Sequence, residues 1–251
     1  MLLQGKNAIV TGCARGIGRK ILAAFAGNGA NVWACCRLRT AEFDGMAEQL
    51  SQSYQVRVTP LCFDLTDGAA TKEAMKTVMA EKVPVDILVN NAGITYNALY
   101  QMTSMEKMRE VFEVNFFAQI ALTQYVIKLM ARQRAGCIIN ISSTAALDAN
   151  PGRGAYGASK AAVACMTRVM AHELAEKNIR VNAIAPGYFR TDMPAAVLAN
   201  PRATQSLLRK VPQRRIAEPE EIGPAVLFLA SPASSFMTGA IIYIDGGYTA
   251  A

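Results

Sequence analysis

Short, almost continuously apolar runs alternate with longer stretches of helical periodicity along the whole chain of 251 residues. The apolar runs are Asn7–Thr11, Asn31–Cys35, Arg57–Phe63, Ile87–Val89, Cys137–Ile141, Arg180–Ile184 and Ala240–Ile244. The helical stretches lie near residues 17–28, 41–53, 67–80, 103–131, 156–177 and 219–230. Continuous apolar character is typical of parallel strands that are buried on both faces. The alternation therefore predicts an α/β fold, a doubly wound parallel sheet with helices on both faces.

The pattern continues without a break in composition, so we expect one domain over residues 1–251. An irregular stretch at about residues 188–218 contains Pro194, Pro201 and Pro212 and has weak helical patterning near Ala195–Leu208. A stretch of this kind predicts a lid over a site, although a surface excursion with short helices fits equally well. Two helix starts are also expected, one from a capping box of Thr103 with Glu106 and one at Pro219.

Composition excludes several classes of protein. Hydrophobic residues make up 52% and charged residues 18%, which is too apolar for a disordered chain. The net charge of +7 suits a soluble surface, an anionic ligand or an acidic partner, and no basic stripe or module indicates nucleic acid. Six cysteines without a C-x-x-C pair and a single histidine predict reduced core thiols and no metal site. No signal peptide or membrane span is apparent, so we expect a cytoplasmic protein.

A glycine-rich turn follows the first predicted strand and opens the first helix. Gly12 suits a tight turn, Gly16 allows the backbone to approach a pyrophosphate, and Gly18 allows the helix to pack against the strand. The helix N-terminus supplies N–H groups to the anion. The turn predicts a dinucleotide site, with a plain turn as the alternative.

The end of the second strand indicates which dinucleotide binds. An NAD site uses an acidic residue there to bind the ribose, but this chain has Arg37, and the first acid is Glu42. Arginine binds phosphate monoesters through paired hydrogen bonds, so Arg37 and Arg15, with Arg39 as a further possibility, favour NADP(H). Two more segments suit the adenosine half: Asp64 after the third strand, and Asn91-Ala92-Gly93, which is also compatible with an ordinary turn.

Tyr156 and Lys160 lie one helical turn apart at the start of a predicted helix. We expect the nearby ammonium, together with a cationic nicotinamide, to lower the pKa of the phenol, so that Tyr156 acts as a general acid or base at a carbonyl or alcohol. Ser143 ends the fifth strand at the same sheet edge and is predicted to hold the substrate oxygen. Asn115 interrupts an apolar helix and is expected to bond a backbone carbonyl or to hold a water. Exposed or capping positions are the alternatives for these residues.

Together, these motifs resemble the short-chain dehydrogenase/reductase family over almost the whole chain, from Lys6 to Gly247. The matching residues and motifs are Thr11-Gly12-x3-Gly16-Ile17-Gly18, Asp64, Asn90-Asn91-Ala92-Gly93, Asn115, Ser143, Tyr156-x3-Lys160, Pro186-Gly187, Thr191 and Asp245-Gly246-Gly247. The resemblance implies a Rossmann-type sheet of seven strands and a catalytic tetrad of Asn115, Ser143, Tyr156 and Lys160. It also implies cofactor contacts from Tyr156, Lys160, Ile17, Leu65, Pro186, Gly187, Phe189 and Thr191, and a homotetramer joined through the helices at 103–131 and 156–177 and the C-terminal strand.

Within the family, the sequence is most similar to the β-ketoacyl-acyl-carrier-protein reductases, as the residues from Gln213 to Ile222 indicate. This similarity implies NADPH-dependent reduction of a 3-oxoacyl thioester of acyl carrier protein or coenzyme A. Arg134 and Lys177 match the basic positions that dock the carrier protein in those enzymes, whereas Arg190 stands where many of them carry an acid.

Two other functions are compatible with these motifs. An NADP-linked dehydrogenase of a sugar, polyol or other secondary alcohol would share every motif and differ in the lid, where Tyr188, Phe189, Met193 and Val197 favour an acyl substrate. A non-catalytic cofactor sensor is disfavoured by the intact tetrad.

Overall fold

The computed structural model describes residues 1–148, 150–191 and 201–250 and contains one parallel sheet of seven strands. The strands are β1 (Asn7–Thr11), β2 (Asn31–Cys36), β3 (Val58–Cys62), β4 (Ile87–Asn90), β5 (Gly136–Ile141), β6 (Ile179–Pro186) and β7 (Ile241–Ile244). Their order in the sheet is β3-β2-β1-β4-β5-β6-β7. The predicted sheet is confirmed, and the chain reverses its direction of winding between β1 and β4. Ligands of open α/β sheets bind at such a switch point.

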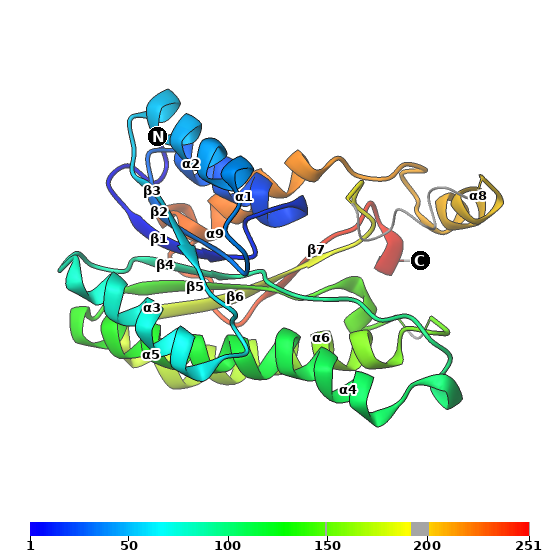
Figure 1. The fold of residues 1–251 in the computed structure, drawn as a ribbon. Coiled ribbons are helices and arrows are strands. Elements are labelled where there is room, and N and C mark those ends of the chain that lie inside the picture. Colours follow the sequence, from blue (N-terminus) through cyan, green and yellow to red (C-terminus); the bar gives the residue numbers. More distant parts are fainter. Residues whose placement is uncertain (149, 192–200, 251) are drawn as a thin grey trace.

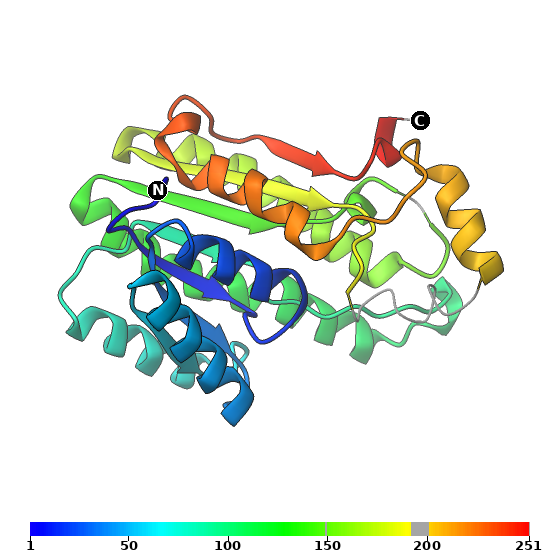
Figure 2. The ribbon, with the colours of Figure 1, turned by 90° about the horizontal axis from the view of Figure 1, so that it is seen from above.

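Helices cover both faces of the sheet (Figures 1 and 2). One face carries α1 (Gly16–Ala26), α2 (Ala41–Tyr54) and α9 (Gly223–Ala230). The other carries α3 (Gly68–Ala80), α4 (Met105–Phe112), α5 (Ala118–Gln133) and α6 (Gly154–Leu174). Side chains of β1 alternate between the two layers: Ala8 and Val10 pack in the core under α1, and Ile9 packs in the core over α5. Burial on both faces explains why the strands are continuously apolar.

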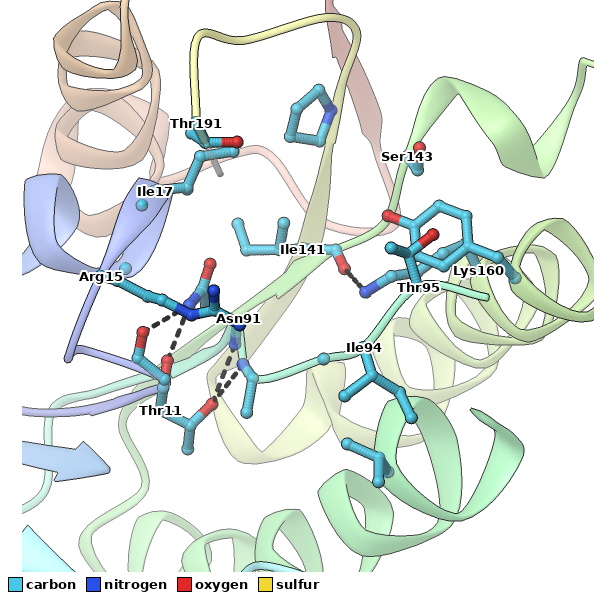
Figure 3. Close-up of a pocket in the computed structure, with 18 of the residues that line it drawn as sticks. Thr11, Arg15, Ile17, Asn91, Ile94, Thr95, Ile141, Ser143, Lys160 and Thr191 are labelled. Atoms are coloured by element: carbon cyan, nitrogen blue, oxygen red, sulfur yellow. Dashed lines mark hydrogen bonds between the residues drawn. The ribbon is translucent and has the colours of Figure 1, made fainter. Parts of the chain in front are cut away.

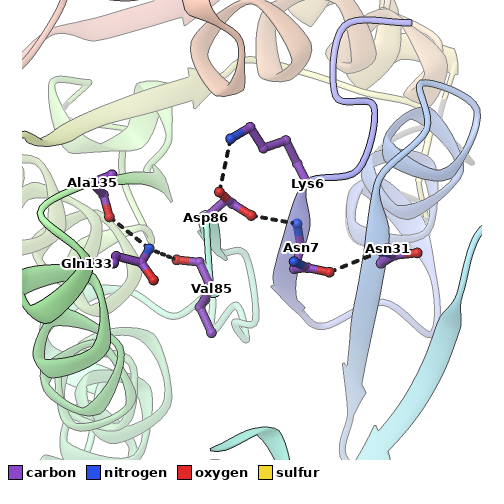
Figure 4. A network of polar contacts seen from close by, with 7 residues as sticks. All are labelled: Lys6, Asn7, Asn31, Val85, Asp86, Gln133 and Ala135. Carbon is purple, nitrogen blue, oxygen red and sulfur yellow. Dashed lines mark hydrogen bonds and ion pairs between the residues drawn. The ribbon is translucent and has the colours of Figure 1, made fainter. Parts of the chain in front are cut away.

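A polar network fixes the edge of the sheet where the strands begin (Figure 4). The Asp86 carboxylate, just before β4, accepts hydrogen bonds from Lys6 Nζ at 3.0 Å and from the Asn7 backbone N–H at 2.9 Å. Asn31 Nδ2 donates to Asn7 Oδ1 at 3.1 Å, so β2 joins the same network. Gln133 Nε2 donates to the Val85 carbonyl at 2.7 Å and ties the end of α5 to this edge. These contacts set the register of β1, β2 and β4, and they leave the opposite edge available for a site.

The start of α4 corrects one expectation from the sequence. Ser104, not Thr103, caps the helix, because its side chain accepts from the Lys107 N–H at 3.2 Å. A 3₁₀ turn, η1 (Tyr100–Met102), precedes this point, and the Thr103 hydroxyl instead donates to the Leu99 carbonyl at 3.2 Å. The predicted Thr103–Glu106 capping box is therefore wrong, because the cap lies one residue later, at Ser104.

The single helix expected over residues 103–131 consists of α4, a π-helical segment η2 (Glu113–Phe117) and α5. Short 3₁₀ turns complete the secondary structure: η3 (Thr144–Ala146), η4 (Ala175–Lys177), η5 (Pro219–Ile222), η6 (Pro232–Ser234) and η7 (Tyr248–Ala250). The helix expected at 219–230 is η5 followed by α9.

The predicted lid is described only in part. Helix α8 (Pro201–Lys210) lies at the same end of the molecule as the C-terminus (Figure 2), whereas Met193 and Val197 fall outside the described residues. Phe189 and Ala217 form a bridge between the two ends of the segment. Arg190 forms an ion pair with Glu218 at 3.0 Å, which neutralises its charge beside this bridge.

The glycines of the first turn give a stability test. A Cβ on Gly18 would overlap the Gly12 carbonyl oxygen, which is backbone and cannot rotate away, whereas a Cβ on exposed Gly45 in α2 would meet open space. We expect Gly18→Ala to destabilise the protein by at least 2 kcal/mol, the order found for overpacking. Gly45→Ala should instead stabilise it by about 0.5–1 kcal/mol because alanine restricts the unfolded chain. Urea unfolding of both variants measures this, and equal effects would contradict the predicted close packing.

Candidate active site

A cavity of about 1120 Å³ opens along the edge of the sheet where the strands end. Every cofactor-binding residue expected from the sequence lines it, from the glycine turn to Thr191. Ser143, Tyr156 and Lys160 line its inner part, whereas Asn115 lies fully buried behind it. The structure thus brings motifs from distant parts of the chain to one place.

The glycine turn is held against β4 by Thr11, which the sequence analysis included in the glycine motif without assigning it a role (Figure 3). The Thr11 hydroxyl accepts hydrogen bonds from the N–H groups of Asn91 and Ala92 at 2.9 and 3.0 Å. In return, Asn91 Nδ2 donates to the carbonyls of Thr11 and Gly12 at 2.9 and 3.2 Å. Gly12 has a φ of +72°, and a Cβ there would lie 2.9 Å from the Cα of Ala92. The two strand ends therefore meet with no room for a side chain between them.

The start of α1 suits an anion. Its N-cap residue, Arg15, makes no side-chain cap, and the first turn contains no acidic residue. The first N–H groups of a helix have no partner within the helix, so they are donors for a phosphate group. A dinucleotide pyrophosphate fits this turn, because the glycines leave its backbone uncovered.

The adenosine end of the cavity carries Arg37 and Asp64. The Asp64 carboxylate accepts from Thr66 Oγ1 at 2.7 Å and from the Thr66 N–H at 2.9 Å, and these bonds hold its pKa below the usual value. Glu42 is paired with Arg19 at 3.0 Å and lies outside the lining of the cavity. Arg39, the further phosphate ligand considered, is instead paired with Asp44.

Two thiols lie side by side near the adenosine end of the cavity. Cys36 and Cys62 are register partners on β2 and β3, and their Sγ atoms are 3.0 Å apart. Burial, with the neighbouring Cys62 sulfur, raises the pKa of Cys36 to about 12. Most cysteines are buried as expected, but Cys165 on α6 is exposed.

Lys160 is almost completely buried, at 3% exposure, and its Nζ donates to the Ile141 carbonyl at 2.8 Å (Figure 3). Burial lowers its pKa to about 8. The charged lysine is therefore held in the interior by one backbone carbonyl, at the end of β5.

Tyr156 departs from the expected titration. Burial raises the pKa of its phenol above the usual value, and a hydrogen bond with Ser143 and the charge of Arg153 oppose the rise only in part. Lys160 Nζ lies 5.9 Å from the ring centroid, over the face of the ring. The expected lowering of the phenol pKa combines the charge of Lys160 with that of a cationic nicotinamide; among the protein's own groups, desolvation outweighs the charges near the phenol. The neutral phenol is therefore the favoured form of Tyr156 near neutral pH.

Asn115 sits in the π-helical segment η2, whose wider turn is a frequent feature of functional sites. Its side chain bonds both backbone groups of Ile94: Oδ1 accepts from the N–H at 2.8 Å, and Nδ2 donates to the carbonyl at 2.9 Å. Nδ2 also donates to Ser159 Oγ at 3.0 Å. The expected bond to a backbone carbonyl is confirmed. Asn115 thus fixes the loop after β4 against the helix that carries Tyr156 and Lys160.

The substrate end of the cavity is polar, which the sequence analysis did not anticipate. Asp148, Asn150 and Arg153 line it, together with Tyr188. Asn150 Nδ2 donates to Tyr248 Oη at 2.9 Å, and Tyr248 Oη donates to the Asp148 carboxylate. Phe189, expected on an apolar substrate wall, is only 2% exposed and packs in the core. The described wall therefore suits a polar substrate as well as an acyl chain.

Arg134 and Lys177 lie together but outside the lining of the cavity. Arg134 Nη2 donates to the Glu176 carbonyl, next to Lys177, at 3.1 Å. Both residues follow the C-terminal ends of helices, near the starts of β5 and β6, whereas Tyr156 is at the other end of α6. Helix α6 has 21 residues and therefore spans about 30 Å. This basic pair is remote from the cavity of its own chain.

The buried Lys160 predicts a stability difference that depends on pH. The pKa of Lys160 is lower in the folded than in the unfolded protein, so burial of the charged lysine costs folding free energy. This cost has its full value below about pH 8 and disappears as pH rises through about 10.4. We expect Lys160→Met to raise the free energy of unfolding at pH 7 by about 3 kcal/mol. The gain should shrink between pH 8 and 10. Denaturant unfolding of both proteins across this range measures it, and a constant difference would contradict the buried charge.

The comparisons with known proteins extend over the whole chain. A family model described as Enoyl-(Acyl carrier protein) reductase matches residues 12–249. The 3-oxoacyl-[acyl-carrier-protein] reductase of Thermotoga maritima is 39% identical over 247 residues, covering 98% of this chain and 99% of the relative. The Escherichia coli reductase of the same name is 36% identical, covering 98% of each chain.

Solved structures give the same architecture. A protein assigned as a gluconate dehydrogenase from Agrobacterium tumefaciens superposes with a TM-score of 0.95 at 30% identity, covering 99% of this chain and 98% of the other. A 7α-hydroxysteroid dehydrogenase in complex with NADH and a 7-oxo bile acid superposes with a TM-score of 0.89 at 35% identity, covering 98% and 94%. With the glycine turn and the Ser143, Tyr156 and Lys160 cluster in one cavity, these matches establish that the chain belongs to the short-chain dehydrogenase/reductase family of oxidoreductases.

Proposed function

We propose that the protein uses NADPH to reduce a 3-oxoacyl thioester, carried by acyl carrier protein or coenzyme A, to the 3-hydroxyacyl form. The observation that carries the proposal is the cavity itself, which is lined by the glycine turn at one end and by Tyr156, Ser143 and Lys160 at the other. The 3-oxoacyl reductases that match the full chain at 36–39% identity support the substrate class.

The side chains take distinct roles in this proposal. NADPH, when bound, supplies the hydride to the carbonyl carbon. Tyr156 gives its phenolic proton to the carbonyl oxygen, which its raised pKa allows at neutral pH. Ser143 donates a hydrogen bond to the same oxygen and stabilises the negative charge that develops there. Lys160 holds the nicotinamide ribose, and Asn115 positions the loop and helix around them, because its side chain bonds Ile94 and Ser159.

The preference for NADPH rests on charge at the adenosine end. Arg37 is exposed there, whereas no acid ends β2 and Glu42 is engaged with Arg19. A 2′-phosphate brings about −1.5 to −2 charges, which a guanidinium binds well. A structural neighbour, assigned as an NAD(P)-dependent gluconate 5-dehydrogenase from Beutenbergia cavernae, contains NADP and supports this choice.

A second candidate substrate is a sugar acid, polyol or related secondary alcohol and its ketone. The polar wall formed by Asp148, Asn150 and Arg153 favours it, because carboxylate, amide and guanidinium groups bind hydroxyls and acids. The gluconate dehydrogenase neighbours agree with this alternative.

We also propose a homotetramer in the cytoplasm. Six free cysteines agree with a reducing compartment. Among the described residues, no helix is long and apolar enough to cross a membrane. Arg134 and Lys177 are remote from the cavity of their own subunit. If they bind an acidic carrier protein, its acyl group would therefore enter the cavity of another subunit.

Activity with a neutral acetoacetyl thioester tests the function. We expect NADPH oxidation, followed at 340 nm, to fall about 10²- to 10⁴-fold in Tyr156→Phe, which loses only the proton donor. Ser143→Ala should lose about 10²- to 10³-fold. Reduction by the wild type should persist into alkaline pH, since the raised phenol pKa keeps Tyr156 protonated. Wild-type turnover of sugar ketones but of no thioester would replace the first candidate by the second.

The cofactor preference is tested by Arg37→Gln. We expect the KM for NADPH to rise about 10- to 100-fold, the order of a lost charge-assisted hydrogen bond, while the KM for NADH stays nearly constant. Arg39→Gln is the matched control, because Arg39 is paired with Asp44 and does not line the cavity. An equal loss for both cofactors would show that Arg37 does not bind the 2′-phosphate.

A further inference from the structure

Arg153 is the residue directly before α6, and it reaches the substrate end of the cavity. Its guanidinium carbon lies 5.9 Å from the ring centroid of Tyr156, the proton donor. Arg153 also lines a second, adjoining cavity of about 560 Å³, which continues past Gly152 toward η1. The side chain is half-buried, so a guanidinium group with five N–H donors is partly withdrawn from water.

In the part of the chain that the structure describes, no carboxylate forms an ion pair with Arg153 and no acceptor bonds its side chain. Other arginines are paired: Arg19 with Glu42, Arg57 with Glu81, and Arg215 with Glu221. Asp148, the carboxylate closest in sequence, is engaged by Tyr248 and Asn150. Glu110 and Glu113 also line the large cavity and form no ion pair with Arg153. The donors of Arg153 are therefore available to a ligand.

Arg153 lies over the Tyr156 ring in a cation–π contact, but the helix that follows disfavours a cation at this position. A cation at the start of a helix faces the positive end of the helix dipole, so Arg153 weakens α6 electrostatically. Residues that break a local rule in this way are frequently functional. Arg37 is the matching case at the adenosine end: it lines the same cavity without a described ion pair, and it faces the place for a phosphate group.

We propose that Arg153 binds an oxyanion of the carbonyl substrate and so selects substrates that carry a negative group within its reach. The proposal rests on the proposed carbonyl reduction and, with a carboxylate, extends its substrates from thioesters to free oxo acids. Carboxylate and phosphate oxygens share the paired geometry that a guanidinium binds. The oxyanion is the carboxylate of an oxo acid or a phosphate of the thioester carrier. The closeness of Arg153 to the Tyr156 ring favours the carboxylate, because it places the oxyanion beside the carbonyl.

Equilibrium binding to the complex of the protein with NADP⁺ tests the proposal without requiring turnover. Three probes differ in charge: acetoacetate, acetoacetyl-coenzyme A and the neutral acetoacetyl-N-acetylcysteamine. We expect Arg153→Gln to raise the calorimetric Kd of acetoacetate about tenfold or more and to leave that of the neutral thioester unchanged. Arg153→Lys should recover part of the loss. Weaker binding of acetoacetyl-coenzyme A alone would assign the oxyanion to the carrier phosphate.

The control variant is Lys76→Gln, which makes the same change in charge on exposed α3, outside both cavities. It should bind all probes like the wild type. Equal losses for the charged and neutral probes in Arg153→Gln would overturn the oxyanion site, as would wild-type protein that binds neither charged probe. Binding of acetoacetate with the expected charge dependence, but without NADPH oxidation on any carbonyl compound, would instead reject the proposed function and leave the site standing.

Discussion

The tie between the ends of β1 and β4 is the contact on which the site depends. Thr11 and Asn91 exchange hydrogen bonds through both side chains and backbones, and Gly12 leaves no side chain between the strands. The chain reverses its winding at this point, so the helices that follow β1 and β4 diverge and open the cavity. The same tie sets the glycine turn on one side and the loop to Ile94 on the other. Asn115 then couples that loop to α6.

Burial determines the proton chemistry of this site. Desolvation raises the pKa of Tyr156 and lowers that of Lys160, so the interior disfavours the charged form of both groups. In the proposed reduction the neutral phenol is the form required, since Tyr156 must hold a proton before it can give one to the carbonyl oxygen. Burial of Lys160 lowers the free energy of unfolding, and such a loss of stability is frequent at functional sites.

The sheet and the cofactor half could be predicted because their signals are local. Continuous apolar runs, a glycine turn and strand-end motifs occupy short segments, and the structure confirms the sheet and gathers these motifs in one cavity. Thr11 was named in the glycine motif, but its hydrogen bonds to the end of β4 were not predicted, because no sequence pattern distinguishes a threonine that makes them. The cap at Ser104 could not be predicted, because the turn η1 sets where the helix begins and the helical periodicity of the sequence does not reveal that turn.

The substrate half could not be predicted in the same way, because it is assembled from distant segments. Asp148 and Asn150 follow β5, Arg153 precedes α6, and Tyr248 joins them from the C-terminal end after β7. No periodicity in the sequence links Tyr248 with Asp148, and their hydrogen bond exists only because β7 lies beside β6.

Similarity over the full chain consequently specifies the cofactor chemistry more sharply than the substrate. The 3-oxoacyl reductases and the gluconate dehydrogenases both match almost the whole chain, and the two groups differ in the carbonyl compounds for which they are named. A charged group at the wall beside Tyr156 changes which carbonyl compound binds, and its charge also acts on the pKa of the phenol. Arg153 occupies such a position, so the choice between a neutral acyl chain and an acid is made by electrostatics at one residue rather than by the fold.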